Sequence, residues 1–358
     1  MKIGVISSYA WVKIANNYGA LLQYYALQEY LRHRGHYVFW LKYILKEPIF
    51  KVLLKELYHS RSLVKLIRYC LCHRYFMSFI KKYLDTSAKT YTTIANLNEK
   101  DNDYDAFITG SDQVWGGTLA ANYLTFVHGK PKIAYAASFG KDTLSKQHSS
   151  TIAPWLKSFN KISVREKSGI DICSELGVYA EHLLDPTLLL YMDDYPSNPK
   201  KSDNDYVFSY FLNAKSADDL YLKKIECFIK EHNLRYYVTA IQGTERFIPS
   251  DYLVYPKPSD WLSYYKYSKF VITNTFHGTV FALIYHRPFI SILQKGKLKG
   301  QNNRIYSLLE MFDLTERLWD GCSDINSIIL KDIDWDSFEI KRSQYIKMTD
   351  NFFEECEL

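Results

Sequence analysis

Short apolar runs alternate with amphipathic stretches from the first residues onward. Residues 2–7 form a largely apolar run that predicts a strand, and apolar positions recur at helical spacing across residues 20–34. Gly35 stands where a glycine commonly ends a helix, and residues 37–40 predict a second strand. This order is typical of the start of a doubly wound α/β domain.

The same alternation continues and restarts after a stretch of turn-forming residues. Further strands are expected at residues 106–109, 132–136 and 161–164. Residues 193–201 concentrate Asp, Pro, Ser, Asn and Lys, which indicates a domain boundary. Beyond it, the pattern predicts strands at 206–211, 235–238 and 270–273, and helices at 217–232 and from about 279.

Two such units predict an α/β protein with two Rossmann-like lobes that face each other, each built on a mostly parallel sheet flanked by helices. A length of 358 residues suits two domains of this kind. We assign residues 1–192 to the N-terminal lobe, with a helical insertion at 42–90, and residues 200–333 to the C-terminal lobe. Residues 334–358 are expected to form a helix that packs on either lobe.

Composition narrows the class of protein. Hydrophobic residues make up 47% of the chain and charged residues 23%, which favours a folded globular protein over a disordered one. The six cysteines include no C-x-x-C pair, so neither a disulfide framework nor a zinc site is expected. The apolar run after Lys2 is too short for a signal peptide, and no run of about 18 apolar residues occurs. We therefore expect a cytoplasmic protein.

The net charge of +6 is unevenly distributed. Residues 42–82 contain ten Lys and Arg but only two acidic residues, with apolar pairs between the cations at near-helical spacing. The segment is either a solvated helical insertion or an amphipathic surface that attaches to an anionic membrane, where each basic residue contributes about 1 kcal/mol. No nucleic-acid partner is expected.

Four short motifs place small or polar residues at the carboxyl ends of predicted strands, where open α/β sheets bind ligands. In the first, Asn17 precedes a helix. Either Asn17 caps this helix, or the free backbone N–H groups at the start of the helix bind an anion. The second contains Asp112, Gln113 and Trp115. A carboxylate accepts hydrogen bonds from sugar hydroxyls and an indole can cover a sugar ring, whereas the alternative is a turn closed by the Asp side chain.

The third motif combines Ser138, in a strand end of small residues, with Arg165 at the next strand end. Small residues let a ligand approach the backbone, and an arginine can hold a carboxylate or phosphate through two parallel hydrogen bonds. The alternative for Arg165 is a salt bridge to Glu166 or to another nearby acid.

The fourth motif places Phe276, His277 and Gly278 where a strand turns into a helix. A phosphate there would meet backbone N–H groups and an imidazole that can transfer a proton. A lone histidine is more often structural. Because His277 alone among the ten histidines occupies such a junction, we favour a functional role for it.

In this order, the motifs resemble those of the polysaccharide pyruvyl transferase family. The matching stretches span residues 17 to about 304, which is most of the chain, and comprise residues 17–20 with Gln23, 110–115, 134–140, 163–166, 184–187, 276–278 and 303–304. Each stretch alone is weakly specific, whereas seven in register are specific.

The resemblance implies a glycosyltransferase-B-like fold and an enzyme that uses phosphoenolpyruvate. Such an enzyme forms a pyruvate ketal across two hydroxyls of a hexose, such as galactose, in a capsular, exopolysaccharide or other cell-envelope glycan precursor, and releases phosphate. Contacts to the donor are expected from Arg165, His277, Gly278, Phe276, Arg304 and Ser138, and contacts to the acceptor from Asn17, Asp112, Gln113 and Trp115.

Two positions depart from the family pattern. Some members carry an arginine two residues before the histidine, where this chain has Thr275, so we expect Arg304 to complete the grip on the donor. Gly116 stands where a polar residue is frequent in the family.

The implied chemistry assigns His277 to proton transfer at the methylene carbon and Asp112 to the sugar hydroxyl, as the group that orients or deprotonates it. No metal or cofactor is expected, since arginines can neutralise the phosphate. The acceptor is either lipid-linked or soluble. Two alternatives stay open: a nucleotide-sugar-dependent glycosyltransferase of the same architecture, and a non-catalytic glycan-binding protein.

Overall fold

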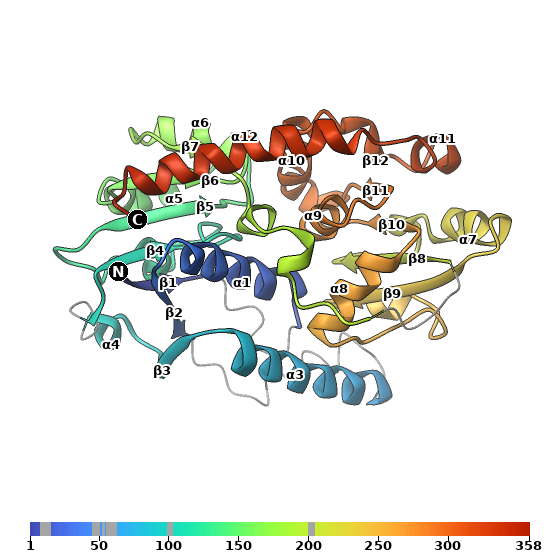
Figure 1. Ribbon diagram of the computed structural model, residues 1–358, viewed down its shortest axis with the longest axis horizontal. Helices are drawn as coiled ribbons and strands as arrows, with labels where there is room; N and C mark the ends of the chain where they lie inside the picture. The colour runs from blue at the N-terminus through green and yellow to red at the C-terminus, as the bar shows by residue number, and fades with distance from the viewer. Residues whose placement is uncertain (8–15, 45–50, 52–53, 55–62, 99–102, 200–204) are drawn as a thin grey trace.

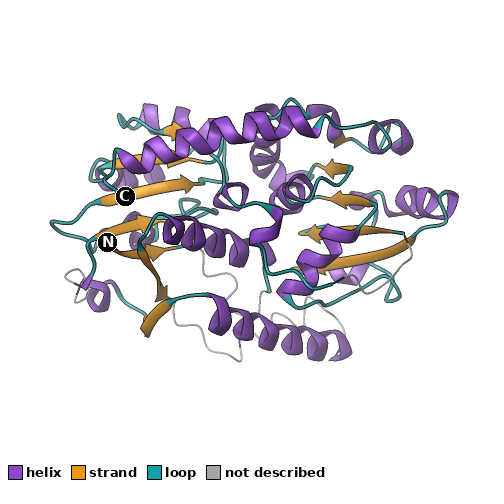
Figure 2. Ribbon diagram, in the orientation of Figure 1, coloured by secondary structure: helices purple, strands orange, loops and turns teal. Residues whose placement is uncertain are grey.

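The computed structural model describes residues 1–7, 16–44, 51, 54, 63–98, 103–199 and 205–358. Within these residues the chain forms two twisted sheets that lie side by side along the long axis of the molecule, each covered by helices (Figures 1 and 2). Every pairing between named strands is parallel, as the alternating sequence pattern indicates. The α/β class and the parallel sheets predicted from the sequence are confirmed.

The N-terminal sheet has the strand order β3-β2-β1-β4-β5-β6-β7. Its strands are β1 (Lys2–Ile6), β2 (Tyr37–Tyr43), β3 (Thr86–Tyr91), β4 (Ala106–Thr109), β5 (Lys132–Ala137), β6 (Lys161–Val164) and β7 (Glu181–His182). The C-terminal sheet has the order β12-β11-β10-β8-β9, with β8 (Tyr206–Leu212), β9 (Arg235–Ile241), β10 (Phe270–Thr273), β11 (Phe289–Ile292) and β12 (Leu318–Trp319).

The α-helices connect and cover these strands: α1 (Tyr18–His33), α3 (Leu63–Tyr83), α4 (Ile94–Asn98), α5 (Lys146–Leu156), α6 (Lys167–Glu175), α7 (Leu222–Glu231), α8 (Pro258–Tyr267), α9 (Phe276–Ile284), α10 (Asn303–Met311), α11 (Ile325–Ile329) and α12 (Trp335–Glu354). Short 3₁₀ helices occur at η2 (Ala120–Tyr123), η3 (Pro186–Leu189), η4 (Met192–Asp194), η5 (Asp218–Leu220), η6 (Thr244–Phe247), η7 (Gly296–Asn302) and η8 (Thr315–Arg317).

Strand order reverses once in each sheet, between β1 and β4 and between β8 and β10. At such a point the connecting helices leave to opposite faces, and a crevice opens outside the carboxyl ends of the strands. The two reversal points therefore mark where a ligand site is expected.

The starts of two helices differ most from the sequence prediction. The helix predicted from about residue 279 begins at Phe276, because the Thr275 side chain caps it by accepting a hydrogen bond from the Gly278 N–H at 2.9 Å. The helix predicted at 217–232 is α7, which begins only at Leu222. The residues before it form η5, and Tyr221 adopts a left-handed conformation with φ 52°.

One hydrophobic cluster runs through both lobes. In this cluster Tyr18 of α1 stacks on Trp261 of α8 with ring centroids 5.0 Å apart, and Phe76 of α3 meets Tyr18 edge-on at 4.7 Å. Burial of these large rings across the junction stabilises the relative placement of the two sheets.

Helix α12 packs on both lobes rather than on one (Figure 1). The ring centroid of Phe353 lies 4.9 Å from that of Tyr135 in the N-terminal sheet, and the ring centroid of Phe338 lies 4.7 Å from that of Phe312, which follows α10. Between them, Arg342 donates to the Leu188 carbonyl at 2.8 Å. The division of the chain at residues 192 and 200 stays a prediction.

The basic segment at 42–82 is described only in part. Its first amphipathic stretch, residues 49–55, lies outside the described residues except at Lys51 and Leu54. The second half contains α3, which buries Cys72, Phe76 and Phe79 against the core. The prediction of a helical insertion over residues 42–90 is wrong at both ends, because β2 extends to Tyr43 and β3 begins at Thr86, where it pairs with β2 at the edge of the sheet. None of the helices in the described part of the chain has the length and apolarity that a membrane span needs. None of the six cysteines forms a disulfide.

Candidate functional site

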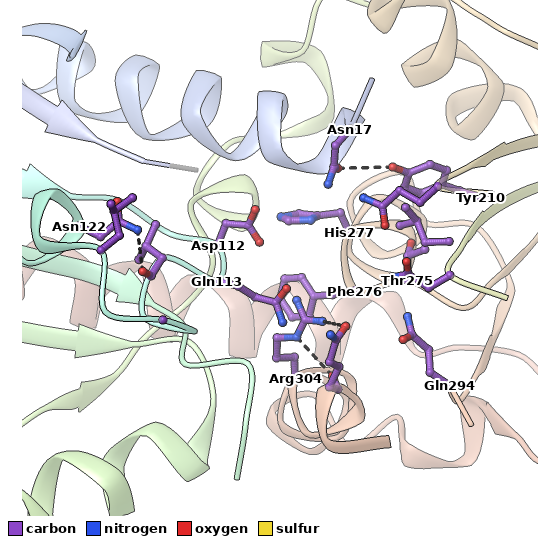
Figure 3. Close-up of a pocket in the computed structure, with 17 residues that line it drawn as sticks. Asn17, Asp112, Gln113, Asn122, Tyr210, Thr275, Phe276, His277, Gln294 and Arg304 are labelled. Carbon is purple, nitrogen blue, oxygen red and sulfur yellow. Dashed lines mark hydrogen bonds between the residues drawn. The ribbon is translucent and has the colours of Figure 1, made fainter. Parts of the chain in front are cut away.

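A cavity of about 520 Å³ lies where the reversal points of the two sheets meet (Figure 3). This volume falls in the range of small-molecule sites. Both lobes line it, and carboxamides are frequent among the lining side chains: Asn17, Gln113, Asn122, Asn213, Gln242, Gln294 and Gln301. The acidic and basic lining residues that the structure describes are Asp112, His277 and Arg304.

Asp112 follows β4 and projects into the cavity opposite His277 (Figure 3). Its backbone has φ 81°, a left-handed conformation that is unfavourable for a residue with a side chain, and it bridges to Ala137 at the end of β5. Such strain is characteristic of functional sites. Burial alone would raise the pKa of this carboxyl, but Arg165, His277 and Arg304 outweigh that effect and lower it.

Asp185 holds the groups behind the cavity together. Its carboxylate accepts hydrogen bonds from Arg165 Nη1 and Ser111 Oγ, both at 2.8 Å, and from Thr187 Oγ1 at 2.6 Å. His277 Nε2 lies 3.5 Å from Asp185 Oδ2. Burial opposes ionisation of this carboxyl, yet His277 and Arg165 hold its pKa well below the usual range.

Arg165 lies behind the cavity wall and does not line it. The side chain is almost fully buried, pairs with Asp185, and lies 3.6 Å from Asp112 Oδ1. The Phe276 ring, which does line the cavity, covers the guanidinium at 4.3 Å. The Nε and Nη2 atoms of Arg165 lack hydrogen-bond partners among the described residues. Burial alone would lower the pKa of Arg165, but the neighbouring carboxylates of Asp185 and Asp112 outweigh this effect, so the pKa is raised overall.

His277 occupies the first turn of α9 and reaches the cavity beside α1. Its ring packs against the backbone of Gly19, where an added Cβ would fall 2.2 Å from Nδ1. Gly278 is equally constrained, since a Cβ there would lie 2.1 Å from Thr273 Oγ1. Glycines at both positions therefore allow α1 and α9 to hold the imidazole at the cavity.

Arg304, in the first turn of α10, points into the cavity near Gln113 and Phe276 (Figure 3). It bonds only to Gln301 among the described residues, at 3.2 Å to Oε1 and 3.3 Å to the carbonyl. Burial and the nearby Arg165 lower its pKa to about 10. A cation without a carboxylate partner, held in a cavity, is suited to binding an anion.

Ser138 supports the wall from behind and does not line the cavity. It donates to Glu166 Oε1 at 2.9 Å, and the same oxygen accepts from the N–H groups of Phe139 at 2.9 Å and Gly140 at 3.2 Å. Glu166 therefore fixes the loop after β5, and the salt-bridge partners of Arg165 are Asp185 and Asp112 instead.

Three further predicted residues have different placements. Asn17 caps α1 by accepting from the Ala20 N–H at 3.2 Å, as the capping interpretation of its motif predicts, and it also lines the cavity. Gln113 lines the cavity as well. Trp115 is completely buried, stacked on Tyr123, so the structure does not bring its indole to the cavity.

Sequence reasoning missed Asp185 and the amides contributed by the C-terminal lobe. The stretch from Leu184 to Thr187 was part of the family resemblance, but nothing in its linear pattern placed Asp185 beside Arg165. Asn213 and Gln242 directly follow strands β8 and β9. Their position at strand ends was the available signal. No cluster of three or more potential metal ligands occurs among the described residues.

Comparisons with known proteins bear on both the fold and the site. Residues 17–295 match the family model described as polysaccharide pyruvyl transferase. No curated protein sequence matches the chain significantly. Among solved structures, the UDP-N-acetylglucosamine 2-epimerase from Rickettsia bellii aligns over 99% of this chain and 96% of its own, with 12% identity and a TM-score of 0.54. This similarity shows a shared glycosyltransferase-B-like fold and nothing about the reaction.

Two other structures align with lower scores. Anabaena Alr3699/HepE, in complex with UDP and glucose, covers 99% of this chain and 100% of its own at 10% identity, with a TM-score of 0.49. The UDP-GlcNAc 2-epimerase from Neisseria meningitidis has the same coverage and identity and a TM-score of 0.46.

Proposed function

The chain belongs to the polysaccharide pyruvyl transferase family, and from this premise we propose that it transfers the pyruvyl group of phosphoenolpyruvate onto two hydroxyls of a hexose in a cell-envelope glycan precursor. The products are a cyclic pyruvate ketal and inorganic phosphate. The family itself supports the broader statement that the chain is a transferase of glycan synthesis.

The observation that supports the proposal most strongly is the grouping of Arg304, His277 and Asp112 around one cavity (Figure 3). These side chains come from α10, α9 and the end of β4, so residues of both lobes form the site. This reaction requires a cation for the donor, a proton-transfer group, and a group that accepts a hydrogen bond from the sugar hydroxyl.

Phosphoenolpyruvate carries a phosphate and a carboxylate, and the site offers two features that bind anions. Arg304 provides a guanidinium without a carboxylate partner, and α9 directs its N-terminus toward the same cavity. Arg165 contributes from behind Phe276, where it keeps Asp112 and Asp185 ionised. Direct contact between Arg165 and the donor would require Phe276 to move.

Proton transfer is assigned to His277. The protonated imidazole delivers a proton to the methylene carbon, which becomes the methyl group, while a sugar hydroxyl adds to the neighbouring carbon. The C–O bond to phosphate then breaks and a second hydroxyl closes the ketal. Of the two hydroxyl protons lost, one replaces the proton that His277 delivered and the other leaves with phosphate. General acid–base catalysis of this kind contributes about 10²- to 10⁴-fold.

Asp112 acts by accepting a hydrogen bond from the attacking hydroxyl. Its carboxyl pKa is lowered by Arg165, His277 and Arg304 even though burial opposes this. A carboxylate with a lowered pKa is a weak base, so orientation of the hydroxyl fits it better than removal of the proton. Of the two roles that the sequence left open for Asp112, orientation and deprotonation of the hydroxyl, we therefore favour orientation.

The alternative is a nucleotide-sugar-dependent glycosyltransferase of the same fold. Calorimetric titration of the protein with phosphoenolpyruvate and with UDP separates the two without knowledge of the acceptor. Binding of phosphoenolpyruvate, lost in a His277→Ala, Arg304→Ala variant, supports pyruvyl transfer. Preference for UDP would replace the proposal with the glycosyltransferase, and binding of neither would favour a non-catalytic glycan-binding protein.

We also propose that the outward half of α3 contacts an anionic membrane and so brings the site to a lipid-linked acceptor. Ile67, Leu71 and Tyr75 are exposed and recur every four residues, which places them on one side of the helix. No acidic residue occurs from residue 57 to residue 84. Exposed apolar side chains among unopposed cations are typical of helices that lie on anionic lipid.

The same helix adjoins the cavity. Phe76 packs on Tyr18, which immediately follows the cavity residue Asn17, and the Tyr18 hydroxyl lies 3.4 Å from Cys72 Sγ. An α3 docked on lipid would therefore keep the site close to the membrane surface.

A further inference from the structure

One wall of the cavity carries no charge. The residues that line it after β8, β9 and β11 are Asn213, Gln242 and Gln294, and the strand residues beside them, Tyr210 and Leu212, are also uncharged. The acidic and basic lining residues, Asp112, His277 and Arg304, come from other elements. A neutral wall suits a neutral ligand, because nothing on it would neutralise a phosphate or carboxylate.

Asn213 and Gln242 lie next to each other across two strands. Leu212 of β8 pairs with Ile241 of β9, so the two amides follow a matched pair in register. Both adopt left-handed conformations, with φ 60° at Asn213 and 57° at Gln242. Such conformations cost free energy for residues other than glycine, and adjacent instances at the edge of a cavity indicate that the side chains are positioned for a ligand.

The three amides keep unused hydrogen-bonding capacity. Neither Asn213 nor Gln242 forms a side-chain hydrogen bond with the described part of the chain. Gln294 donates through Nε2 to the Asn274 carbonyl at 3.3 Å, whereas its buried Oε1 lacks a partner among the described residues. Carboxamides both donate and accept, as sugar hydroxyls do, so each can satisfy a hydroxyl in either role.

We propose that Asn213, Gln242 and Gln294 form a neutral subsite that binds hydroxyls of the acceptor glycan. The subsite deepens the proposed function and rests on it for the identity of the acceptor. It places the acceptor against the C-terminal lobe and leaves Arg304 and His277 to the donor.

A second cavity extends the subsite. It has a volume of about 280 Å³ and shares Asn213 and Gln294 with the first, and its lining also includes the charged residues Lys215, Asp219 and Lys295. Asn213 and Gln294 therefore stand between the two spaces. An acceptor longer than one sugar unit can occupy the second space while its terminal hexose lies beside His277.

The test uses glycine substitutions, because glycine tolerates the left-handed backbone while the whole side chain, with its amide, is removed. The variant is Asn213→Gly, Gln242→Gly. Its matched control is Asn233→Gly, an exposed residue that follows α7 with φ 50° and lies outside both cavities. Binding of methyl galacto-, gluco- and mannopyranosides is measured by saturation-transfer NMR, and binding of phosphoenolpyruvate by calorimetry.

We expect wild type and the Asn233→Gly control to bind at least one hexoside, and the double variant to bind it roughly tenfold more weakly, with phosphoenolpyruvate binding unchanged. Equal hexoside binding by all three proteins, or no hexoside binding by wild type, overturns the subsite. Loss of phosphoenolpyruvate binding in the double variant also overturns it, since the amides would then serve the donor. Hexoside binding without phosphoenolpyruvate binding would contradict pyruvyl transfer and leave the subsite standing.

Discussion

Asp185 connects two groups of the site through one buried carboxylate. Replacement by Asn removes the charge that faces Arg165 Nη1 at 2.8 Å and leaves a buried guanidinium with only the more distant Asp112. Breaking a buried ion pair in this way costs about 3 to 5 kcal/mol. We expect Asp185→Asn to lower the free energy of unfolding by this amount in urea titrations.

The control for Asp185→Asn is Asp193→Asn. Asp193 pairs with Lys266 but its side chain is 85% exposed, so the change should stay within about 1 kcal/mol. Equal effects of the two substitutions would contradict a structural role for the buried carboxylate.

The lowered pKa of Asp185 also predicts how stability depends on pH. A carboxyl with a lower pKa in the folded state contributes stability above its unfolded pKa of about 3.9, and this contribution is lost as the pH falls toward the folded value. Wild type should therefore lose stability steeply below about pH 4. The urea midpoint of Asp185→Asn should fall less steeply over the same range, and identical slopes would argue against the pKa shift.

Arg304 is the cation that this account assigns to the donor. Removing a charged hydrogen-bond donor from an anion site costs about 10- to 100-fold in affinity, so Arg304→Ala should weaken phosphoenolpyruvate binding by that factor in calorimetry. Arg304→Lys should be intermediate, because it keeps the charge and loses the planar fork. Lys299→Ala removes an exposed cation from the preceding η7 and should change little.

At the scale of elements, the contact between α1 and α9 places the imidazole. A Cβ at Gly19 would lie 2.2 Å from His277 Nδ1 and 2.7 Å from its Cβ, so Gly19→Ala must displace the ring. Displacement of a catalytic group by about 1 Å can cost about 10²-fold, and we expect turnover to fall by that order. Gly300→Ala, where no atom lies within 4 Å, serves as the control. Normal turnover in Gly19→Ala would contradict the role of His277.

The proposed membrane contact of α3 is tested by vesicle co-sedimentation. Arg74, Lys81 and Lys82 are exposed, and replacing all three with Ser should weaken binding to phosphatidylglycerol-containing vesicles by roughly a hundredfold. An Ile67→Ser, Leu71→Ser variant should also bind less. Its control is Ile340→Ser, Met348→Ser, which removes exposed apolar side chains from α12. Co-sedimentation that does not depend on phosphatidylglycerol would overturn the contact.

At the scale of the whole molecule, periodicity predicted most strands of both sheets but missed β3, β7, β11 and β12. Strands 106–109, 161–164 and 270–273 coincide with β4, β6 and β10, because buried parallel strands are short continuous apolar runs. The predicted start of α9 was less accurate. Its beginning depends on the Thr275 cap, which apolar spacing does not record.

Site residues were predictable where they end a strand and less so where their contacts cross the fold. Asp112 and His277 line the cavity as their motifs indicated, whereas Arg165 lies behind it. Trp115 was expected at the cavity because an exposed indole suits a sugar, but Tyr123 packs on it from a segment whose position the motif did not reveal. The link through Asp185 joins residues far apart in sequence and required the structure.

The transfer of the pyruvyl group itself tests the central claim most directly. Carbon-labelled phosphoenolpyruvate is incubated with the protein and with the lipid-linked and soluble glycan fractions of the host cell, and label in glycan is measured beside phosphate release. We expect labelled glycan and phosphate in equal amounts from wild type, and neither from His277→Ala. Labelling of glycan without release of phosphate would contradict pyruvyl transfer. Transfer only from a labelled UDP-sugar offered in parallel would also contradict it.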